Sequence, residues 1–238
     1  GTKWGGVMCS CACVQEGSLF KAHADWLDER LGQSHAGPTV VITHHAPSRR
    51  RKDLLMVTRA EIIADHSIGG LGACQALSAA TDTWISRIFT DAIAGEKKAD
   101  DLVILAVGGY GRRELSPHSD LDILLVHKSV KNVSDIASKI WYPIWDAGVK
   151  LGHAVRTPKE TIQLCGTDLD TATALVTARV IAGNQSLGAE IINGAAESWR
   201  KRGREWLVEL HQRILDRYAK DGEVAFLLEP NLKEGLGG

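Results

Sequence analysis

The sequence predicts an α/β fold in which a small β-sheet is combined with amphipathic helices. Residues 102–107 are wholly apolar, and residues 121–126 are apolar apart from Asp122; short apolar runs of this kind are typical of buried strands. Longer segments before and after these runs carry apolar residues at three- and four-residue spacing, which is the period of an α-helix. The chain has 238 residues, of which 44% are hydrophobic, so it can form one large domain or two small ones.

Further helices and one further strand are expected around this pair of strands. In chain order we expect helices over about residues 53–64, 73–94 and 133–147, a strand over about 149–157, a helix over 168–183, and a helical stretch over about 187–219. Pro143 is expected to kink the third helix, because proline lacks an amide donor. Asp168 is a favourable N-cap and Gly183 a favourable stop for the fourth helix. Gly194 and Gly203 are candidate breaks in the last one.

The composition excludes several classes of protein. Lys and Arg number 28 and Asp and Glu number 29, so the net charge gives no overall attraction to nucleic acid. No apolar run approaches the roughly 20 residues that span a bilayer. The five cysteines are odd in number and unevenly spaced, which argues against a disulfide framework and favours a reducing compartment. We therefore expect a cytoplasmic protein that binds neither nucleic acid nor a membrane.

Residues 1–48 differ from the rest and are expected to form an atypical segment, either foreign or left from a fusion. An apolar run over residues 38–43 is followed by His44 and His45. Residues 17–48 faintly resemble a piece of the calcineurin-like metallophosphoesterases, in which a His at such a strand end binds a metal. The other ligands of that family have no match here, so the piece cannot build a two-metal site alone.

The segment between the two apolar strands carries the chemistry. Gly108, Gly109 and Gly111 follow the first strand, and their lack of a β-carbon allows backbone N–H groups to approach a ligand such as phosphate closely. Asp120 and Asp122 are two residues apart at the second strand, so their carboxylates share one face. Paired carboxylates repel each other unless a cation lies between them, and Mg²⁺ takes oxygen ligands of this kind together with substrate phosphates.

Neither feature is specific alone, but together they indicate a site. A Gly-Gly turn is common, and an Asp-x-Asp pair is often a solvated strand edge. Here ten residues separate Gly109 from Asp120, and the acidic pair interrupts an otherwise apolar strand, where uncompensated charge is costly. The combination predicts a site for a metal-bound nucleotide.

The run from Gly108 to Asp122 resembles the nucleotidyltransferase superfamily typified by polymerase β. It resembles more closely the bacterial uridylyltransferase/uridylyl-removing enzymes, which modify the nitrogen-regulatory protein PII. Two later segments, residues 145–157 and 228–238, also agree with that family, and the similarity runs from about Arg50 to the end. The resemblance implies a polymerase-β-like fold with a small mixed sheet in residues 50–158. A helical region and a truncated C-terminal loop would then occupy residues 159–238.

The resemblance also implies the reaction and its residues. Asp120 and Asp122 would hold Mg²⁺ on UTP, and a tyrosine of PII would attack the α-phosphate, releasing pyrophosphate. The residues expected to contact the nucleotide are Gly108, Gly109, Gly111, Arg112 and Ser119. Arg112 has an alternative, which is to face solvent or pair with Glu114. The base stays unassigned, because residues 149–157 offer no third carboxylate. His153 could touch nucleotide or be a core histidine.

Two other functions remain open. The related adenylyltransferases transfer another nucleotide to another protein, and a truncated chain could bind nucleotide and PII without turnover. The full family also carries a hydrolase domain that removes UMP. This chain contains no His-Asp pair, so we expect it to be a fragment that lacks the uridylyl-removing activity.

Overall fold

The structure, a computed structural model, describes residues 49–221. The expected N-terminal segment 1–48, with its metallophosphoesterase-like piece, lies outside the described residues. The motif at 228–238 lies outside them as well. The described residues include the two apolar strands and the glycine-rich segment between them.

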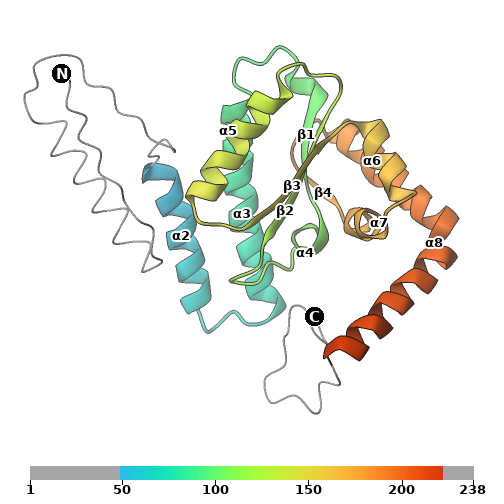
Figure 1. Ribbon diagram of the computed structural model, residues 1–238. Coiled ribbons are helices and arrows are strands. Elements are labelled where there is room, and N and C mark those ends of the chain that lie inside the picture. Colours follow the sequence, from blue (N-terminus) through green and yellow to red (C-terminus); the bar gives the residue numbers. More distant parts are fainter. Residues whose placement is uncertain (1–48, 222–238) are drawn as a thin grey trace, which may run out of the picture. The chain divides into compact units, whose positions relative to one another are not determined.

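Four strands form one mixed sheet in the order β3-β2-β1-β4 (Figure 1). The strands are β1 (Leu102–Ala106), β2 (Leu121–His127), β3 (Leu151–Arg156) and β4 (Arg179–Gly183). Strand β1 runs antiparallel to β2 and β4, whereas β2 and β3 are parallel. The mixed sheet and the helices that follow it confirm the expected α/β class, and they are consistent with a polymerase-β-like nucleotidyltransferase fold.

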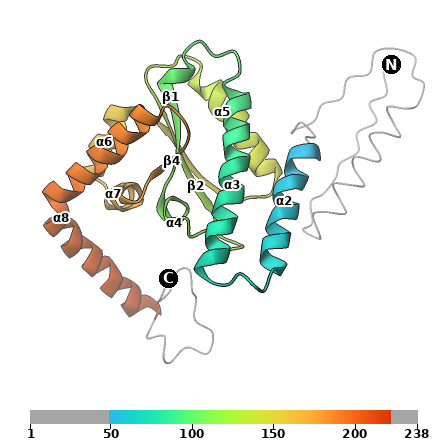
Figure 2. The ribbon, with the colours of Figure 1, turned by 180° about the vertical axis from the view of Figure 1, so that it is seen from behind.

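One face of the sheet is covered by the helices that surround the first two strands in sequence. These are α3 (Leu71–Ala92) and α5 (Val133–Asp146), and α2 (Arg49–Ala64) packs against α3. Alternate side chains of the central strands, such as Ile104 and Ile123, pack there against Ile88 and Ile140. Because side chains alternate across a strand, the residues between them face the other way. Figures 1 and 2 show α3 and α5 on the same side of the sheet.

The opposite face is covered by the three helices of the C-terminal region. These are α6 (Pro158–Cys165), α7 (Leu169–Val176) and α8 (Gln185–Asp221). Their buried residues, including Leu175 and Ile191, pack against Leu105, Leu124 and Val126 of the central strands. The sheet therefore lies between two helical layers, which explains why β1 is buried along its whole length.

The expected helix over residues 168–183 is wrong in its second half. Helix α7 ends at Val176, and residues 179–183 form β4 on the free side of β1. Val180 and Ile181 are β-branched residues that favour a strand. Pairing with β4 also satisfies the outer backbone groups of β1, which could not be left without partners inside the fold.

Helix α8 is continuous, so the expected breaks at Gly194 and Gly203 are not found. A β-carbon at Gly194 would lie 2.8 Å from Cδ1 of Ile162, so this glycine allows α6 and α8 to approach closely. Helix α5 contains Pro143 within its span, and the kink expected there stays a prediction. Among residues 49–221, none of the helices has the length and apolar character needed to cross a bilayer.

Candidate functional site

The glycine-rich segment lies where the end of β1 meets the start of β2. Because the two strands are antiparallel neighbours, the chain leaves β1 and returns to the adjacent strand at the same end of the sheet. Its first residues form a four-residue helix, α4 (Gly108–Gly111). The N–H of Val107 donates to the carbonyl of Asp122 over 3.1 Å, so the start of the segment is tied to the acidic strand.

The carboxylate of Asp122 lies between two glycines. A β-carbon at Gly108 would lie 3.3 Å from Oδ2 of Asp122, and one at Gly152 would overlap Oδ1. Gly152 is the residue of β3 that pairs with Asp122 across the parallel ladder. Gly108 also has a φ of 59°, a backbone conformation that favours glycine. Both glycines therefore make room for this carboxylate, one from the glycine-rich segment and one from the next strand.

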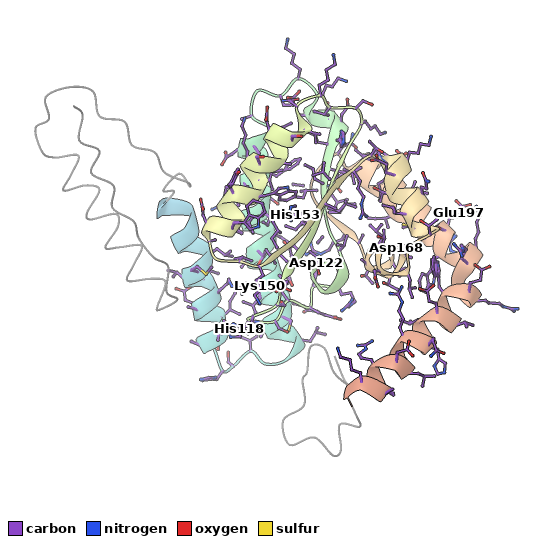
Figure 3. The ribbon with its side chains drawn as sticks, viewed as in Figure 1. His118, Asp122, Lys150, His153, Asp168 and Glu197 are labelled. Atoms are coloured by element: carbon purple, nitrogen blue, oxygen red, sulfur yellow. The ribbon has the colours of Figure 1, made fainter. Side chains whose placement is uncertain are left out.

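The same end of the sheet gathers several other polar residues. Asp120 immediately precedes β2 and is partly buried, as Asp122 is. The N–H of Leu121 donates to the carbonyl of Lys150 over 2.9 Å, which sets the start of β3 beside the start of β2. Figure 3 labels Lys150 and Asp122 at this end of the sheet. The structure thus brings together the acidic pair, the glycine-rich turn and the beginning of β3.

The remaining expected contact residues hold local hydrogen bonds. Nε of Arg112 donates to Glu114 over 2.6 Å, which is the pairing that the sequence left open as an alternative. The hydroxyl of Ser119 donates to the carbonyl of Ser116 over 3.0 Å. Gly111 is buried, and a β-carbon there would overlap the carbonyl oxygen of Thr177, so its lack of a side chain serves packing.

His153 lies on the other face of the sheet. Its ring centroid is 5.2 Å from that of Trp141 and 5.4 Å from that of Trp145, both on α5. Because adjacent strand residues point to opposite faces, His153 faces away from Gly152 and the carboxylate of Asp122.

Sequence reasoning missed three residues that surround α4. Asp82 on α3 and Arg179 on β4 form an ion pair beside Tyr110, and Thr177 contacts the turn from the end of α7. Asp82 is one of several polar residues along α3, so no local pattern singled it out or named a partner for it. These residues come from segments about 30 and 70 positions away, which periodicity cannot connect.

The residues at this end of the sheet fit a magnesium ion. Asp120 and Asp122 provide the hard oxygen ligands that Mg²⁺ prefers, and the glycines on either side of Asp122 make room for its carboxylate at this position. In residues 49–221 there is no cluster of three or more His, Cys, Asp or Glu side chains arranged to hold a metal. A site built on two carboxylates would therefore take its other ligands from substrate phosphates and water, as Mg²⁺ sites commonly do.

Comparison with known proteins found relatives among bacterial enzymes. The chain is 38% identical over 182 residues to the bifunctional uridylyltransferase/uridylyl-removing enzyme of Streptomyces coelicolor. The matched region covers 76% of this chain and 21% of that protein. It is 41% identical over 146 residues to the enzyme of the same name from Mycobacterium tuberculosis, covering 60% of this chain and 18% of the relative. It is 32% identical over 187 residues to the enzyme of the same name from Phenylobacterium zucineum. That match covers 73% of this chain and 20% of the relative.

The chain is thus homologous to bacterial bifunctional uridylyltransferase/uridylyl-removing enzymes over most of its length. It spans about a fifth of the length of the curated relatives it matches. No protein-family model matches it.

Proposed function

We propose, from the homology of this chain to bacterial bifunctional uridylyltransferase/uridylyl-removing enzymes, that it is a magnesium-dependent nucleotidyltransferase. Its reaction is the transfer of UMP from UTP to a tyrosine of the nitrogen-regulatory protein PII, with release of pyrophosphate. Because the chain corresponds to about a fifth of those enzymes, the nucleotide, the protein partner and a cytoplasmic location belong to this proposal. The removal of UMP is not part of it.

One observation carries the proposal. The carboxylate of Asp122 lies between Gly108 of the glycine-rich turn and Gly152 of β3. This arrangement supports the proposal because it sets the carboxylate that would bind the metal directly against the backbone that would receive the phosphates. If the acidic pair were only part of a solvated strand edge, neither glycine would be needed, because an exposed carboxylate can turn away from its neighbours.

Each group would have a defined task. Asp120 and Asp122 would hold Mg²⁺, and the turn at Gly108 and Gly109 would let backbone N–H groups approach the triphosphate. When bound, Mg²⁺ would offset the negative charge of the phosphates at the reacting centre. The tyrosine oxygen of PII attacks the α-phosphorus, the bond to the bridging α–β oxygen breaks, and pyrophosphate leaves with that electron pair. The phenolic proton passes to a base that remains unassigned.

The test follows the label of the nucleotide. The purified chain is incubated with Mg²⁺, PII and α-labelled UTP, with labelled ATP and CTP in parallel. We expect labelling of PII from UTP, and we expect Asp122→Asn to lower the rate by about 100-fold or more, because it removes a charged ligand used at the reacting centre.

The matched control is Asp101→Asn. Asp101 precedes β1 at the opposite end of the sheet and pairs with Lys98 over 3.9 Å, so its replacement should leave the rate unchanged. Equal rates for the wild-type chain and Asp122→Asn would overturn the proposal. Labelling from ATP alone would assign the chain to the adenylyltransferases, and magnesium-dependent UTP binding without labelling would make it a binding fragment.

A further inference from the structure

The short helix α4, which contains the glycine-rich turn, is held by side chains from two distant elements. Oδ1 of Asp82, on α3, accepts a hydrogen bond of 2.7 Å from the hydroxyl of Tyr110. The guanidinium of Arg179, on β4, donates to both carboxylate oxygens of Asp82 over 2.7 and 2.8 Å. The same guanidinium donates to the backbone carbonyl of Tyr110 over 3.2 Å and lies 5.1 Å from the centre of its ring.

The segment that enters β4 contacts α4 at its first and last residues. The hydroxyl of Thr177 lies 3.4 Å from the carbonyl of Gly108, to which it donates. The carbonyl of Thr177 occupies the space where a side chain at Gly111 would lie. Thr177 and Arg179 therefore contact both ends and the middle of the four-residue helix. We call these two residues, together with Asp82, the α4 brace.

The brace is partly shielded from solvent, so its interactions count for more than those of a surface pair. The side chains of Arg179 and Asp82 are 18% and 24% exposed, and a two-point contact between guanidinium and carboxylate fixes both position and orientation. Burial is the main cause that raises the pKa of Tyr110, and the negative charge of the nearby Asp82 carboxylate raises it further. The phenol therefore keeps its proton and continues to donate to Asp82 at any physiological pH.

A glycine-rich turn needs such support to bind a nucleotide well. Glycine has the largest backbone freedom of any residue, so ordering Gly108, Gly109 and Gly111 upon binding would cost conformational entropy. A turn that is already ordered avoids that cost, and its affinity for ligand rises accordingly.

We propose that Arg179, acting through Asp82 and Tyr110, is a positioning residue that holds the Gly108–Gly111 turn in the conformation that receives the triphosphate. The effect that this positioning would have on turnover rests on the proposed function. The structural part of the proposal, the ordering of the turn, is independent of substrate. The two parts are therefore measured separately.

The first measurement is amide hydrogen exchange in the full chain without nucleotide. Three hydrogen bonds report on the turn: Gly111 N–H to Val107, Arg112 N–H to Gly108 and Glu114 N–H to Gly109. Arg179→Lys keeps the charge but loses the fork geometry, and Asp82→Asn keeps an acceptor but loses the charge. We expect each variant to speed exchange over residues 107–115 by about 10-fold, since the turn then opens more often.

The second measurement separates positioning from general stability. We expect the KM for UTP to rise about 10-fold in both variants while the KM for PII stays unchanged, because only the phosphate-receiving turn is loosened. The matched control is Arg202→Lys. Arg202 also lies over an aromatic ring, that of Trp206, and donates to the carbonyl of Gly166. This control should lower the melting temperature without altering exchange over residues 107–115 or the KM for UTP.

Each outcome decides a different claim. Unchanged exchange over residues 107–115 in both brace variants would overturn the proposal, and so would faster exchange with an unchanged KM for UTP. If the wild-type chain transfers no nucleotide and binds none, the proposed function fails. The exchange contrast between Arg179→Lys and Arg202→Lys then still shows whether the brace orders the turn.

Discussion

At the scale of single residues, the carboxylate of Asp122 depends on what its neighbours lack. Gly152 pairs with Asp122 across the β2–β3 ladder, and any β-carbon there would overlap Oδ1. A larger residue would push the carboxylate away from the turn at Gly108 or force the two strands apart. The position of this catalytic candidate is therefore set by a residue about 30 positions away that has no side chain.

Gly152→Ala tests that dependence. The added methyl group displaces the Asp122 carboxylate, so we expect transfer of UMP to fall by about 10- to 100-fold, as it does when a supporting residue of a metal site is changed. The measurement is the initial rate of PII labelling, with circular dichroism to verify that the chain is folded.

The control for this substitution is Gly69→Ala. No heavy atom lies within 4 Å of the position that a β-carbon would take at Gly69, so the rate should not change. A rate in Gly152→Ala equal to that of the wild-type chain would show that the carboxylate does not need its present position.

At the scale of elements, the start of α6 is set by a reciprocal pair of hydrogen bonds. The Thr157 hydroxyl accepts from the N–H of Glu160, and the Glu160 carboxylate accepts from the N–H of Thr157. This capping box follows directly after β3. It therefore sets the point at which the chain leaves the sheet edge and crosses to the face covered by α7 and α8.

The capping box predicts a pH-dependent contribution to stability. The pKa of Glu160 is lowered mainly by the hydrogen bond that its carboxylate accepts from the N–H of Thr157. The hydrogen bond from the Thr157 hydroxyl lowers it further. A carboxyl group with a lowered pKa in the folded state stabilises the fold above its unfolded-state pKa, and this contribution is lost as the pH falls through the folded-state pKa. We expect Glu160→Gln to be less stable than the wild-type chain at pH 7, and the difference to shrink below pH of about 4.

Urea unfolding at several pH values measures this difference. Thr157→Ala provides the second arm, because it removes the partner hydroxyl and should cost about 1 kcal/mol at neutral pH. A stability difference between Glu160→Gln and wild type that stays constant from pH 7 to pH 3 would contradict the capping interpretation.

At the scale of the whole molecule, one sheet serves two cores. Alternate residues of β1 face α3 and α5 on one side and the C-terminal helices on the other. The start of α8 belongs to the second core, where Ile191 is completely buried. Farther along the same helix, Leu207 is 58% exposed. These two positions on α8 should therefore differ sharply in what they contribute to folding.

Ile191→Ala and Leu207→Ala measure that difference on one helix. The first leaves a cavity in the core between α8 and the sheet and should lower the free energy of unfolding by about 2–5 kcal/mol. The second removes exposed atoms and should change it by no more than about 0.5 kcal/mol. Equal losses in the two variants, measured by urea unfolding, would contradict the difference in burial between Ile191 and Leu207.

The sequence by itself determined the α/β class, the two central strands and the acidic pair beside a glycine-rich segment. These features depend on local pattern: β1 is a continuous apolar run because both of its faces are buried, and α3 shows a regular apolar stripe because only one of its faces is. The resemblance to uridylyltransferases was also visible there and is confirmed by homology.

Only the tertiary structure decided the rest. Residues 179–183 could have continued a helix by their periodicity, but they form β4 because β1 offers a free edge at that place. The pairing of Gly152 with Asp122 and the contact of Arg179 with Asp82 join residues 30 and 97 positions apart. Such contacts are set by strand register and helix packing, which depend on the whole chain, and no local pattern records them.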